Sequence, residues 1–527
     1  MTPRLFCIIT IILSLQGFIN GASRPNIVFV FSDDHATQAL GAYGFEITKF
    51  APTPYLDALA RQGMRFDRCM VTNSICGPSR AVILTGKYSH LNGFGTNDDA
   101  VFNGSQVTFP KLLQNAGYET AIIGKWHLFS EPTGFNHWEV LPNQGRYYRP
   151  EFITPKGEHV EEGYCTEVIT DKAIDWLNKN RNSKQPFMLM VQHKAPHREW
   201  SPDTKYLDLY EDLTMPEPET LFDNYKNRGT AAREQDMSIE HSLEEDRDLK
   251  ISGNVIGRDF YEQVYIHLTP EQKKSWDKVI ARRTKEFSVL EGKALVRWKY
   301  QQYIKDYMRC IRSVDDSVGR IQKTLEDLGL DKNTVFIYSS DQGFFLGEHG
   351  WFDKRFMYDE SYRTPLLIKW PGVVEPNSSS RELVSNLDFA QTFLDMAGVE
   401  ADTNMQGKSL LPLLKGDKNQ HRDFHYYHYS EYPGWHMVKR HEGVYDGRYK
   451  LIYFYDIKEW ELYDLVKDPQ EMKNEVMSPE YSSVLANMQE NLTKARMQYK
   501  VPEGYPAPRA IENPDVYYSK QRTKKTR

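Results

Sequence analysis

Hydrophobic runs short enough to be strands alternate along the chain with longer segments of helical periodicity. Tyr303–Leu328 is the clearest helical segment, because its apolar residues recur at intervals of three and four. Tyr55–Phe66 and Asp171–Asn180 are predicted helices of the same kind. Alternating strands and helices predict an α/β fold with a central, mostly parallel sheet flanked by helices. The predicted strands are Asn26–Phe31, Thr120–Ile123, Phe187–Val191, Thr334–Tyr338 and Leu366–Trp370.

Polar clusters directly follow four of these strands. Ligands bind at the carboxyl ends of the strands in an open α/β sheet, so the clusters predict one shared site. The alternative interpretation is a set of unrelated turns and helix caps, where Asp is common. Four clusters in succession favour the shared site. They are Asp33 with Asp34, Lys125 with His127, His193 with His197, and Asp341 with Gln342.

The pattern changes in two later regions. Residues 201–299 are highly charged and predict a helical insertion, which is either the rim of a cleft or a solvated excursion. From Arg422 the chain is dense in aromatic and β-forming residues, which predict a small antiparallel sheet closed by a helix at Tyr481–Tyr499. We expect a catalytic domain over residues 23–400 and a smaller α+β C-terminal domain over residues 401–527 that completes the cleft.

The N-terminus predicts export. Arg4 precedes an apolar run at Leu5–Ile19, which is short for a membrane span and typical of a signal peptide over residues 1–22. We expect no stable membrane insertion, and a final location in the periplasm, at the cell surface or outside the cell. With 66 basic and 72 acidic residues the net charge is −6, which argues against a nucleic-acid partner.

Carboxylates at the predicted strand ends indicate a metal site. Adjacent carboxylates after a buried strand repel each other and are costly to desolvate, and a cation relieves both effects. An all-oxygen donor set suits Ca²⁺ or Mg²⁺ better than zinc. The predicted donors are Asp33, Asp34, Asp341 and Gln342.

Positive side chains are expected around the same space, and they favour an anionic substrate such as a sulfuryl or phosphoryl group. The nucleophile stays open on residue chemistry alone. Cys76 should lie at the start of a buried helix, where free N–H groups favour anions, but a soft thiolate is a poor partner for a hard cation. The positive and titratable groups are Arg80, Lys125, His127, His197 and Lys354.

The stretch Cys76-Gly77-Pro78-Ser79-Arg80, followed by Leu84-Thr85-Gly86, resembles the signature of the type I sulfatases. Gly124-Lys125-Trp126-His127 and Ser340-Asp341-Gln342-Gly343 are similar to further motifs of that family. The resemblance implies an alkaline-phosphatase-like large domain and a sulfuric ester hydrolase. It also implies that a formylglycine-generating enzyme converts Cys76 to Cα-formylglycine, whose hydrate attacks the sulfur.

The same resemblance implies roles for the other site residues. One Ca²⁺ per chain would be held by Asp33, Asp34, Asp341, Gln342 and the residue at position 76. Arg80 and Lys125 would hold the nucleophile and the sulfate, with His127 beside the formylglycine hydroxyl. His197 and Lys354 would lie near the leaving oxygen, with His197 as general acid. His193 is an alternative to His197, or it caps its strand.

The expected substrate is a sulfated oligo- or polysaccharide. Gln192–Trp200 and Asp353–Tyr358 are similar to segments of bacterial carbohydrate sulfatases, including N-acetylglucosamine-6-sulfatase-like and ulvan-type enzymes, so an algal polysaccharide and a glycosaminoglycan or mucin glycan both stay open. The competing hypotheses are a phosphate or phosphonate ester hydrolase and a catalytically silent glycan-binding relative. The candidate substrate contacts, which could also be ordinary polar surface, are His193, Trp200, Arg355, His436, Arg440 and His441.

Overall fold

The computed structural model describes residues 24–97, 101–251 and 258–505. The predicted signal peptide at residues 1–22 lies outside the described residues. Among the described helices, none is long and apolar enough to cross a membrane.

The largest sheet formed by the described residues has ten strands in the order β14-β2-β13-β9-β1-β8-β4-β5-β6-β7. The five central strands, from β9 to β5, are all parallel, whereas β13, β6 and β7 pair antiparallel with their neighbours. All five predicted strands are present in this sheet, which confirms the central, mostly parallel architecture. The strands are β1 (Asn26–Ser32), β2 (Met64–Phe66), β4 (Glu119–Lys125), β5 (His137–Leu141), β6 (Glu151–Thr154), β7 (Gly157–Val160), β8 (Phe187–Gln192), β9 (Thr334–Ser340), β13 (Leu366–Lys369) and β14 (Ser378–Ser380).

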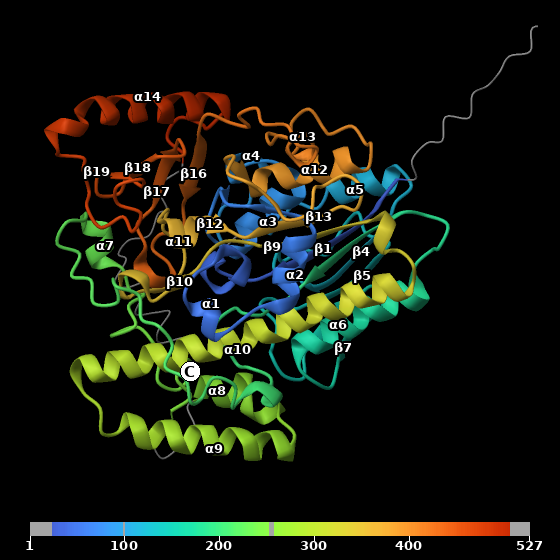
Figure 1. Cartoon of the computed structure of the whole chain (residues 1–527), viewed down its shortest axis with the longest axis horizontal. Helices are drawn as coiled ribbons and strands as arrows, with labels where there is room; N and C mark the ends of the chain where they lie inside the picture. The colour runs from blue at the N-terminus through green and yellow to red at the C-terminus, as the bar shows by residue number, and fades with distance from the viewer. Residues whose placement is uncertain (1–23, 98–100, 252–257, 506–527) are drawn as a thin grey trace, which may run out of the picture.

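Helices cover both faces of this sheet (Figure 1). Side chains alternate along β1, so Val28 and Val30 join one hydrophobic cluster while Ile27 and Phe29 join the other. The first cluster includes α2, α6 and α10, and the second includes α3, α5, α12 and α13. Burial on both faces explains why these strands are continuous apolar runs in the sequence. The helices are α2 (Pro54–Gln62), α3 (Cys76–Thr85), α5 (Phe109–Asn115), α6 (Cys165–Asp175), α10 (Gly292–Asp327), α12 (Phe389–Met396) and α13 (Leu411–Leu414).

Several predicted helix boundaries were wrong. The predicted helix Tyr55–Phe66 ends at Gln62, and Met64–Phe66 forms β2 instead, because Gly63 packs against the backbone of β13 at Ile368. The helix predicted from Tyr303 begins eleven residues earlier, at Gly292. Pro78 is the third residue of α3 rather than its first, a place in the first turn where no backbone hydrogen bond is lost.

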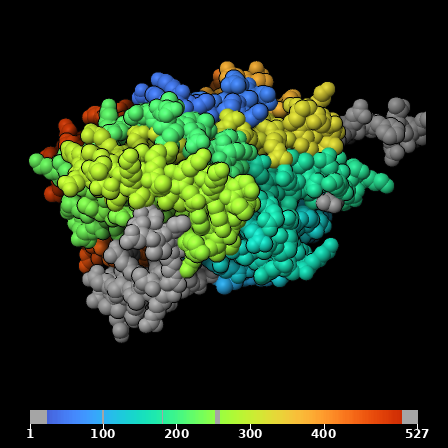
Figure 2. Space-filling model, turned by 90° about the horizontal axis from the view of Figure 1, so that it is seen from below, coloured from blue at the N-terminus to red at the C-terminus, as the bar shows by residue number. Residues whose placement is uncertain are grey.

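Among the described residues of the charged segment at 201–299 are α7 (Thr230–Glu234), α8 (Arg258–Gln263), α9 (Pro270–Phe287) and the first turns of α10. Figure 2 shows that this segment, green to yellow-green, forms much of one face of the molecule. Its apolar side chains, such as Trp276 and Leu249, belong to the same hydrophobic cluster as α10. The segment is therefore packed onto the large domain.

A four-stranded antiparallel sheet follows in the C-terminal part, with α14 (Ser482–Gln498) packed on one side of it (Figure 1). The small antiparallel sheet and the closing helix that the sequence predicts after Arg422 are both present. The strands are β16 (His425–Tyr429), β17 (His441–Tyr445), β18 (Tyr449–Phe454) and β19 (Glu459–Asp464).

Short elements connect these layers. A small sheet contains β3 (Cys69–Met70), β12 (Arg363–Thr364) and β15 (Val384–Ser385), and a hairpin contains β10 (Phe345–Leu346) and β11 (Phe352–Asp353). The remaining short helices are α1 (Ile47–Phe50), α4 (Ser89–Asn92) and α11 (Asp359–Tyr362).

Candidate active site

The ends of β1, β4 and β9 meet at one edge of the central sheet and bring the predicted clusters together. Gly124 makes the close contact between β4 and β8 possible: its φ is 109°, and a Cβ there would lie 2.0 Å from the carbonyl oxygen of Gln192. Ser79 of α3 donates to the carbonyl of Asp341 at 2.5 Å, which fixes the start of that helix against the end of β9.

Three buried carboxylates form the centre of this edge. Carboxylate oxygens of Asp33, Asp34 and Asp341 lie within 4.8 Å of one another. Among the described residues, no hydrogen-bond donor reaches Asp33 Oδ1 or Gln342 Oε1, although both atoms are buried. Burial and mutual repulsion raise the pKa of Asp34 and of Asp341. Crowded acceptors of this kind fit a hard divalent cation.

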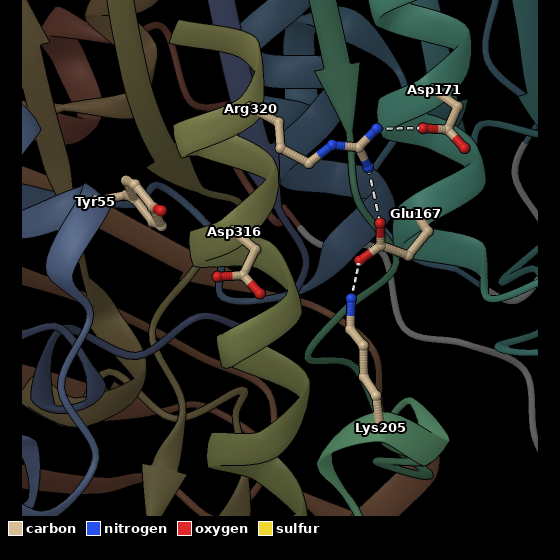
Figure 3. Close-up of a pocket in the computed structure, with 6 residues that line it drawn as sticks. All are labelled: Tyr55, Glu167, Asp171, Lys205, Asp316 and Arg320. Carbon is tan, nitrogen blue, oxygen red and sulfur yellow. Dashed lines mark hydrogen bonds and ion pairs between the residues drawn. The ribbon is translucent and has the colours of Figure 1, made fainter. Parts of the chain in front are cut away.

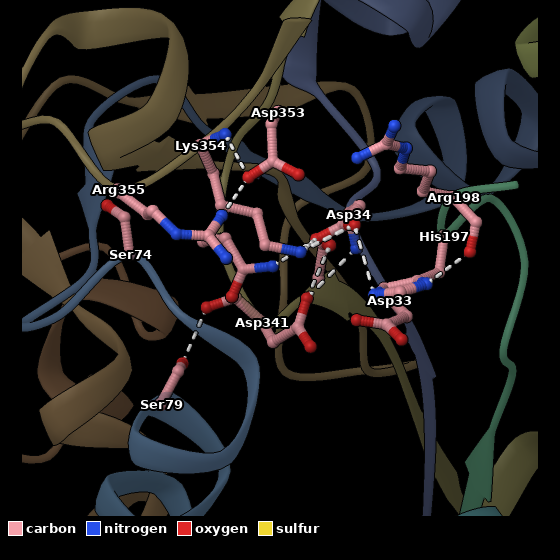
Figure 4. A network of polar contacts seen from close by, with 12 residues as sticks. Asp33, Asp34, Ser74, Ser79, His197, Arg198, Asp341, Asp353, Lys354 and Arg355 are labelled. Atoms are coloured by element: carbon pink, nitrogen blue, oxygen red, sulfur yellow. Dashed lines mark hydrogen bonds and ion pairs between the residues drawn. The ribbon is translucent and has the colours of Figure 1, made fainter. Parts of the chain in front are cut away.

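Each of the three carboxylates also pairs with one cation. Arg80 Nη2 lies 3.0 Å from Asp341 Oδ2, and Lys125 donates to Asp33. Lys354 Nζ lies 2.6 Å from Asp34 Oδ1 (Figure 4). Three negative and three positive groups balance to zero. A bound divalent cation would therefore leave the site with a positive charge suited to an anionic ligand.

Cys76 is the first residue of α3 and is 1% exposed. Its sulfur lies within 4.8 Å of ligand atoms of Asp33 and His197. Burial raises the pKa of the Cys76 thiol to about 12, so the unmodified side chain is a neutral thiol near pH 7. Gly77 is required beside it, because a Cβ at that position would lie 2.6 Å from Asn97 Oδ1.

Gln144, which the sequence analysis missed, links two predicted residues. Its Oε1 accepts from Lys125, so its amide nitrogen faces His127 Nε2 at 3.1 Å. An amide donor at Nε2 places the imidazole proton on Nδ1. Burial and Lys125 hold the pKa of His127 well below its usual value. The available signal was the apolar pair Val140–Leu141 at the end of β5, a strand that the sequence did not predict. Polar residues, including Gln144, follow it closely.

The two histidines of the 193–197 segment lie in different surroundings. His197 Nε2 lies 3.9 Å from Asp34 Oδ2, and its Nδ1 lies 2.5 Å from the carbonyl oxygen of Arg198. His193 is buried, and its Nε2 lies 2.9 Å from Ser317 Oγ on α10. The contacts of His193 favour the strand-capping alternative over a role at the site.

Two of the predicted substrate contacts meet at Asp353. Arg355 Nη1 pairs with Asp353 Oδ1, and His436 Nε2 lies 3.4 Å from Asp353 Oδ2. Burial alone would raise the pKa of Asp353, but Arg355, His436 and Lys354 outweigh it and hold the pKa well below its usual value. This charged group is continuous with the site through Lys354 (Figure 4).

The other predicted substrate contacts have different partners. Arg440 pairs with Asp456, and His441 Nε2 accepts from the Met357 backbone N–H at 3.2 Å. Trp200 is fully buried, with its ring centroid 4.6 Å from that of Tyr303. In this structure these three side chains do not join the carboxylates and Cys76.

A second pocket opens on the surface between α6 and α10 (Figure 3). Its charged groups pair with one another: Glu167 lies 2.7 Å from both Lys205 and Arg320, and Asp171 lies 2.5 Å from Arg320. Because these charges are paired with one another and none of its lining residues is a predicted site residue, this pocket is not the candidate active site.

Comparison with known proteins assigns the family. Residues 25–399 match the family model described as sulfatase. The chain belongs to the sulfatase family. Residues 347–498 also match the model of the C-terminal part of N-sulphoglucosamine sulphohydrolase. This chain is therefore a sulfuric ester hydrolase, as its resemblance to the type I sulfatases implies.

Relatives of known activity or structure cover most of the chain. The N-acetylglucosamine-6-O-sulfatase of Bacteroides thetaiotaomicron is 49% identical over 90% of this chain and 87% of its own length. An ulvan-active sulfatase of Formosa agariphila is 24% identical, covering 90% of this chain and 81% of its own. A solved structure in complex with its substrate D-glucosamine-2-N,6-O-disulfate superposes with a TM-score of 0.89 at 48% identity, covering 92% and 100%. These similarities confirm the alkaline-phosphatase-like fold with a smaller C-terminal sheet and helix.

Proposed function

We propose that this sulfatase is exported and removes the 6-O-sulfate of sulfated glucosamine residues, using Ca²⁺ and a formylglycine at position 76. The observation that carries the proposal is the arrangement of Cys76, buried at the start of α3 beside three carboxylates and ringed by Arg80, Lys125 and Lys354. The higher identity to the N-acetylglucosamine-6-O-sulfatase supports glucosamine over ulvan as the sugar.

The residues that would hold Ca²⁺ are Asp33, Asp34, Asp341 and Gln342. The fit rests on their buried, crowded oxygens and on the two acceptor atoms that no described donor reaches. When bound, the ion supplies charge neutralisation for the sulfate oxygens. Relief of the repulsion that raises the pKa of Asp341 would keep all three carboxylates ionised.

Position 76 needs an oxygen nucleophile. A buried thiol with a pKa of about 12 supplies almost no thiolate near neutral pH, and thiolate suits an oxygen-ligated hard cation poorly. Hydrated formylglycine supplies a hydroxyl there, which makes a formylglycine-generating enzyme the required maturation partner.

The surrounding residues bind the sulfate and move protons. Arg80 and Lys125 hold sulfate oxygens, and His127 keeps its proton on Nδ1 because Gln144 occupies Nε2. His197 keeps one proton on Nδ1, since the Arg198 carbonyl can only accept. Its Nε2 therefore faces the centre. Burial and Lys125 hold the pKa of His197 well below its usual value, so an imidazolium formed there is a strong proton donor toward the leaving sugar oxygen beside Lys354.

Arg355 and His436 are the best placed of the predicted sugar contacts. Asp353, directly before Lys354, pairs with both side chains, and Lys354 in turn pairs with Asp34 at the site. Arg440 and His441 are less suited, because their partners Asp456 and the Met357 backbone do not link them to the three carboxylates.

The test compares release of sulfate from N-acetylglucosamine-6-sulfate, glucosamine-2-N,6-O-disulfate and sulfated ulvan oligosaccharides. We expect turnover of the two glucosamine esters and at most weak turnover of ulvan. Mass spectrometry of residues 71–80 should show formylglycine in the active protein. Faster hydrolysis of an aryl phosphate than of the matching aryl sulfate would instead support the phosphate or phosphonate hydrolase. Absence of all turnover by the matured protein would support the catalytically silent glycan-binding relative.

A further inference from the structure

A second buried group of charged residues lies between the inserted segment and α10, which we call the anchor cluster: Lys250, Arg283, Asp306 and Arg309. Asp306 of α10 accepts from Arg283 at 2.8 and 2.9 Å and from Arg309 at 3.0 Å, and it lies 3.2 Å from Lys250 Nζ. The side chains of all four residues are buried. Burying ions costs several kcal/mol each, so a packing role alone explains this group poorly.

Lys250 connects the anchor cluster to the segment that follows His197. Besides Asp306, its ammonium donates to the backbone carbonyls of Glu199 at 2.8 Å and Trp200 at 3.0 Å. It also donates to the carbonyl of Asp248 at 3.0 Å. A residue of the insertion thereby holds the main chain two and three residues after His197.

The neighbouring Arg198 is held from the same segment of the insertion. Its Nε and Nη2 donate to the two oxygens of Asp248, at 2.8 and 2.5 Å, and its guanidinium carbon lies 5.0 Å from the Phe352 ring centroid. Such a bidentate pair fixes the plane of the guanidinium. Figure 4 shows Arg198 directly beside His197.

The backbone of Arg198 in turn sets the imidazole. Its carbonyl lies 2.5 Å from His197 Nδ1 and can only accept, so it selects the Nδ1–H tautomer and directs Nε2 toward Asp34. We infer that Lys250 and Asp248 are positioning residues, which hold residues 198–200 so that His197 Nε2 meets the leaving oxygen of the sugar. The inference rests on the proposed function, in which His197 is the proton donor.

Leaving groups of different basicity separate positioning from simple stabilisation. A sugar alkoxide leaves only with a proton, whereas 4-nitrophenolate leaves readily without one. Misplacing the donor should therefore slow hydrolysis of N-acetylglucosamine-6-sulfate and spare 4-nitrophenyl sulfate. Loss of folded protein would slow both equally.

The test measures kcat and KM of Lys250→Met on both esters. We expect kcat for the sugar sulfate to fall about 10- to 100-fold, with a change of less than about 3-fold for the aryl sulfate. The matched control is Lys305→Met, a buried lysine of α10 that donates to the Glu211 carbonyl at 2.9 Å, outside the 198–200 segment. Asp306 keeps Arg283 and Arg309 in Lys250→Met, which favours correct folding of the variant.

Further variants make the result decisive. His197→Ala should show the same leaving-group pattern more strongly, and adding Lys250→Met to it should cause no further selective loss. If Lys250→Met does not fold, the near-isosteric Asp248→Asn takes its place with the same expected pattern. Equal losses on both esters, or the same pattern in Lys305→Met, would overturn the inference. Wild-type protein that hydrolyses neither ester would instead overturn the proposed function.

Discussion

The anchor cluster and the carboxylates at the sheet edge are two buried groups of charged side chains that differ in whether their acceptor atoms receive hydrogen bonds. In the anchor cluster every oxygen of Asp306 accepts a hydrogen bond, and Asp248 is likewise engaged at both oxygens. At the carboxyl edge of the sheet, Asp33 Oδ1 and Gln342 Oε1 accept none from the described residues.

The pKa directions separate Asp306 from Asp341, although Asp33 at the sheet edge also has a lowered pKa, because Lys125, His197 and Arg80 outweigh its burial. Burial raises the pKa of Asp306, but Arg283 and Lys250 outweigh it and hold the pKa low. At Asp341, burial and Asp33 act together and raise the pKa against the pull of Arg80. A buried cluster whose acceptors are all hydrogen-bonded stabilises the fold, whereas one with crowded carboxylates and unused acceptors is suited to bind a ligand.

The largest expected effect is on catalysis. Cys76→Ala should reduce sulfate release at least about 10³-fold, because it removes the nucleophile while leaving the binding groups in place. The matched control is Cys310→Ala, since Cys310 is equally buried but lies on α10. Turnover assays on matured protein test this; a loss in both variants would point to folding instead of chemistry.

Loss of a carboxylate should lower the free energy of unfolding much more in the anchor cluster than at the sheet edge. Asp306→Asn leaves Lys250, Arg283 and Arg309 without their counter-ion, and should lower the free energy of unfolding by about 3–5 kcal/mol. Asp341→Asn, measured in EGTA, removes one of three crowded carboxylates and should cost much less. Urea unfolding of both variants measures the two free energies of unfolding. Equal destabilisation would contradict the distinction between the two clusters.

Calcium should stabilise only the cluster at the sheet edge. At a free concentration of one hundred times Kd, we expect it to raise the free energy of unfolding by about 2.7 kcal/mol. Asp34→Asn should abolish the increase, whereas Asp248→Asn, which removes the partner of Arg198, should retain it. Thermal unfolding across a calcium titration measures both; an equal calcium response in Asp34→Asn would remove Asp34 from the ligand set.

In EGTA the stability should depend on pH. The folded-state pKa is about 6 for Asp34 and about 8 for Asp341, both above the unfolded value, so the folded state binds more protons. Stability contributed by these protons is present below the unfolded pKa of about 4 and is lost as the pH rises to about 8. Saturating calcium should weaken the trend and leave the part that comes from Asp315 and Glu471, whose pKa burial raises to about 7. An unchanged trend would assign all of it to such other groups.

The sequence predicted the sheet-edge cluster well for a physical reason. Buried parallel strands are continuous apolar runs, so the residues that follow them, such as Asp33 and Asp341, are found without knowledge of packing. Lys354 and Arg355 come from the irregular chain after β11, where no strand end marks them, so the strand pattern offered no structural reason for placing either at the site.

The anchor cluster could not be predicted in this way. Lys250 and Asp306 are 56 residues apart; Lys250 lies in the charged segment at 201–299, and Asp306 is a charged position in the predicted helix Tyr303–Leu328. Their burial depends on how the insertion folds onto α10, which no local pattern specifies. Gln144 was missed for a related reason, because β5 is too short and too polar to appear as a buried run.

The smallest expected effect concerns the surface pocket beside α6. Asp171 pairs with Arg320 at 2.5 Å, but both side chains are substantially exposed, and exposed ion pairs contribute little. Asp171→Asn should therefore change the free energy of unfolding by less than about 0.5 kcal/mol and leave turnover unchanged. Arg320 retains Glu167 in this variant, so no buried charge is stranded. Urea unfolding and sulfate release are measured side by side on this variant and on Asp306→Asn. A loss of stability or turnover as large as in Asp306→Asn would contradict the expectation and group the pocket with the buried clusters.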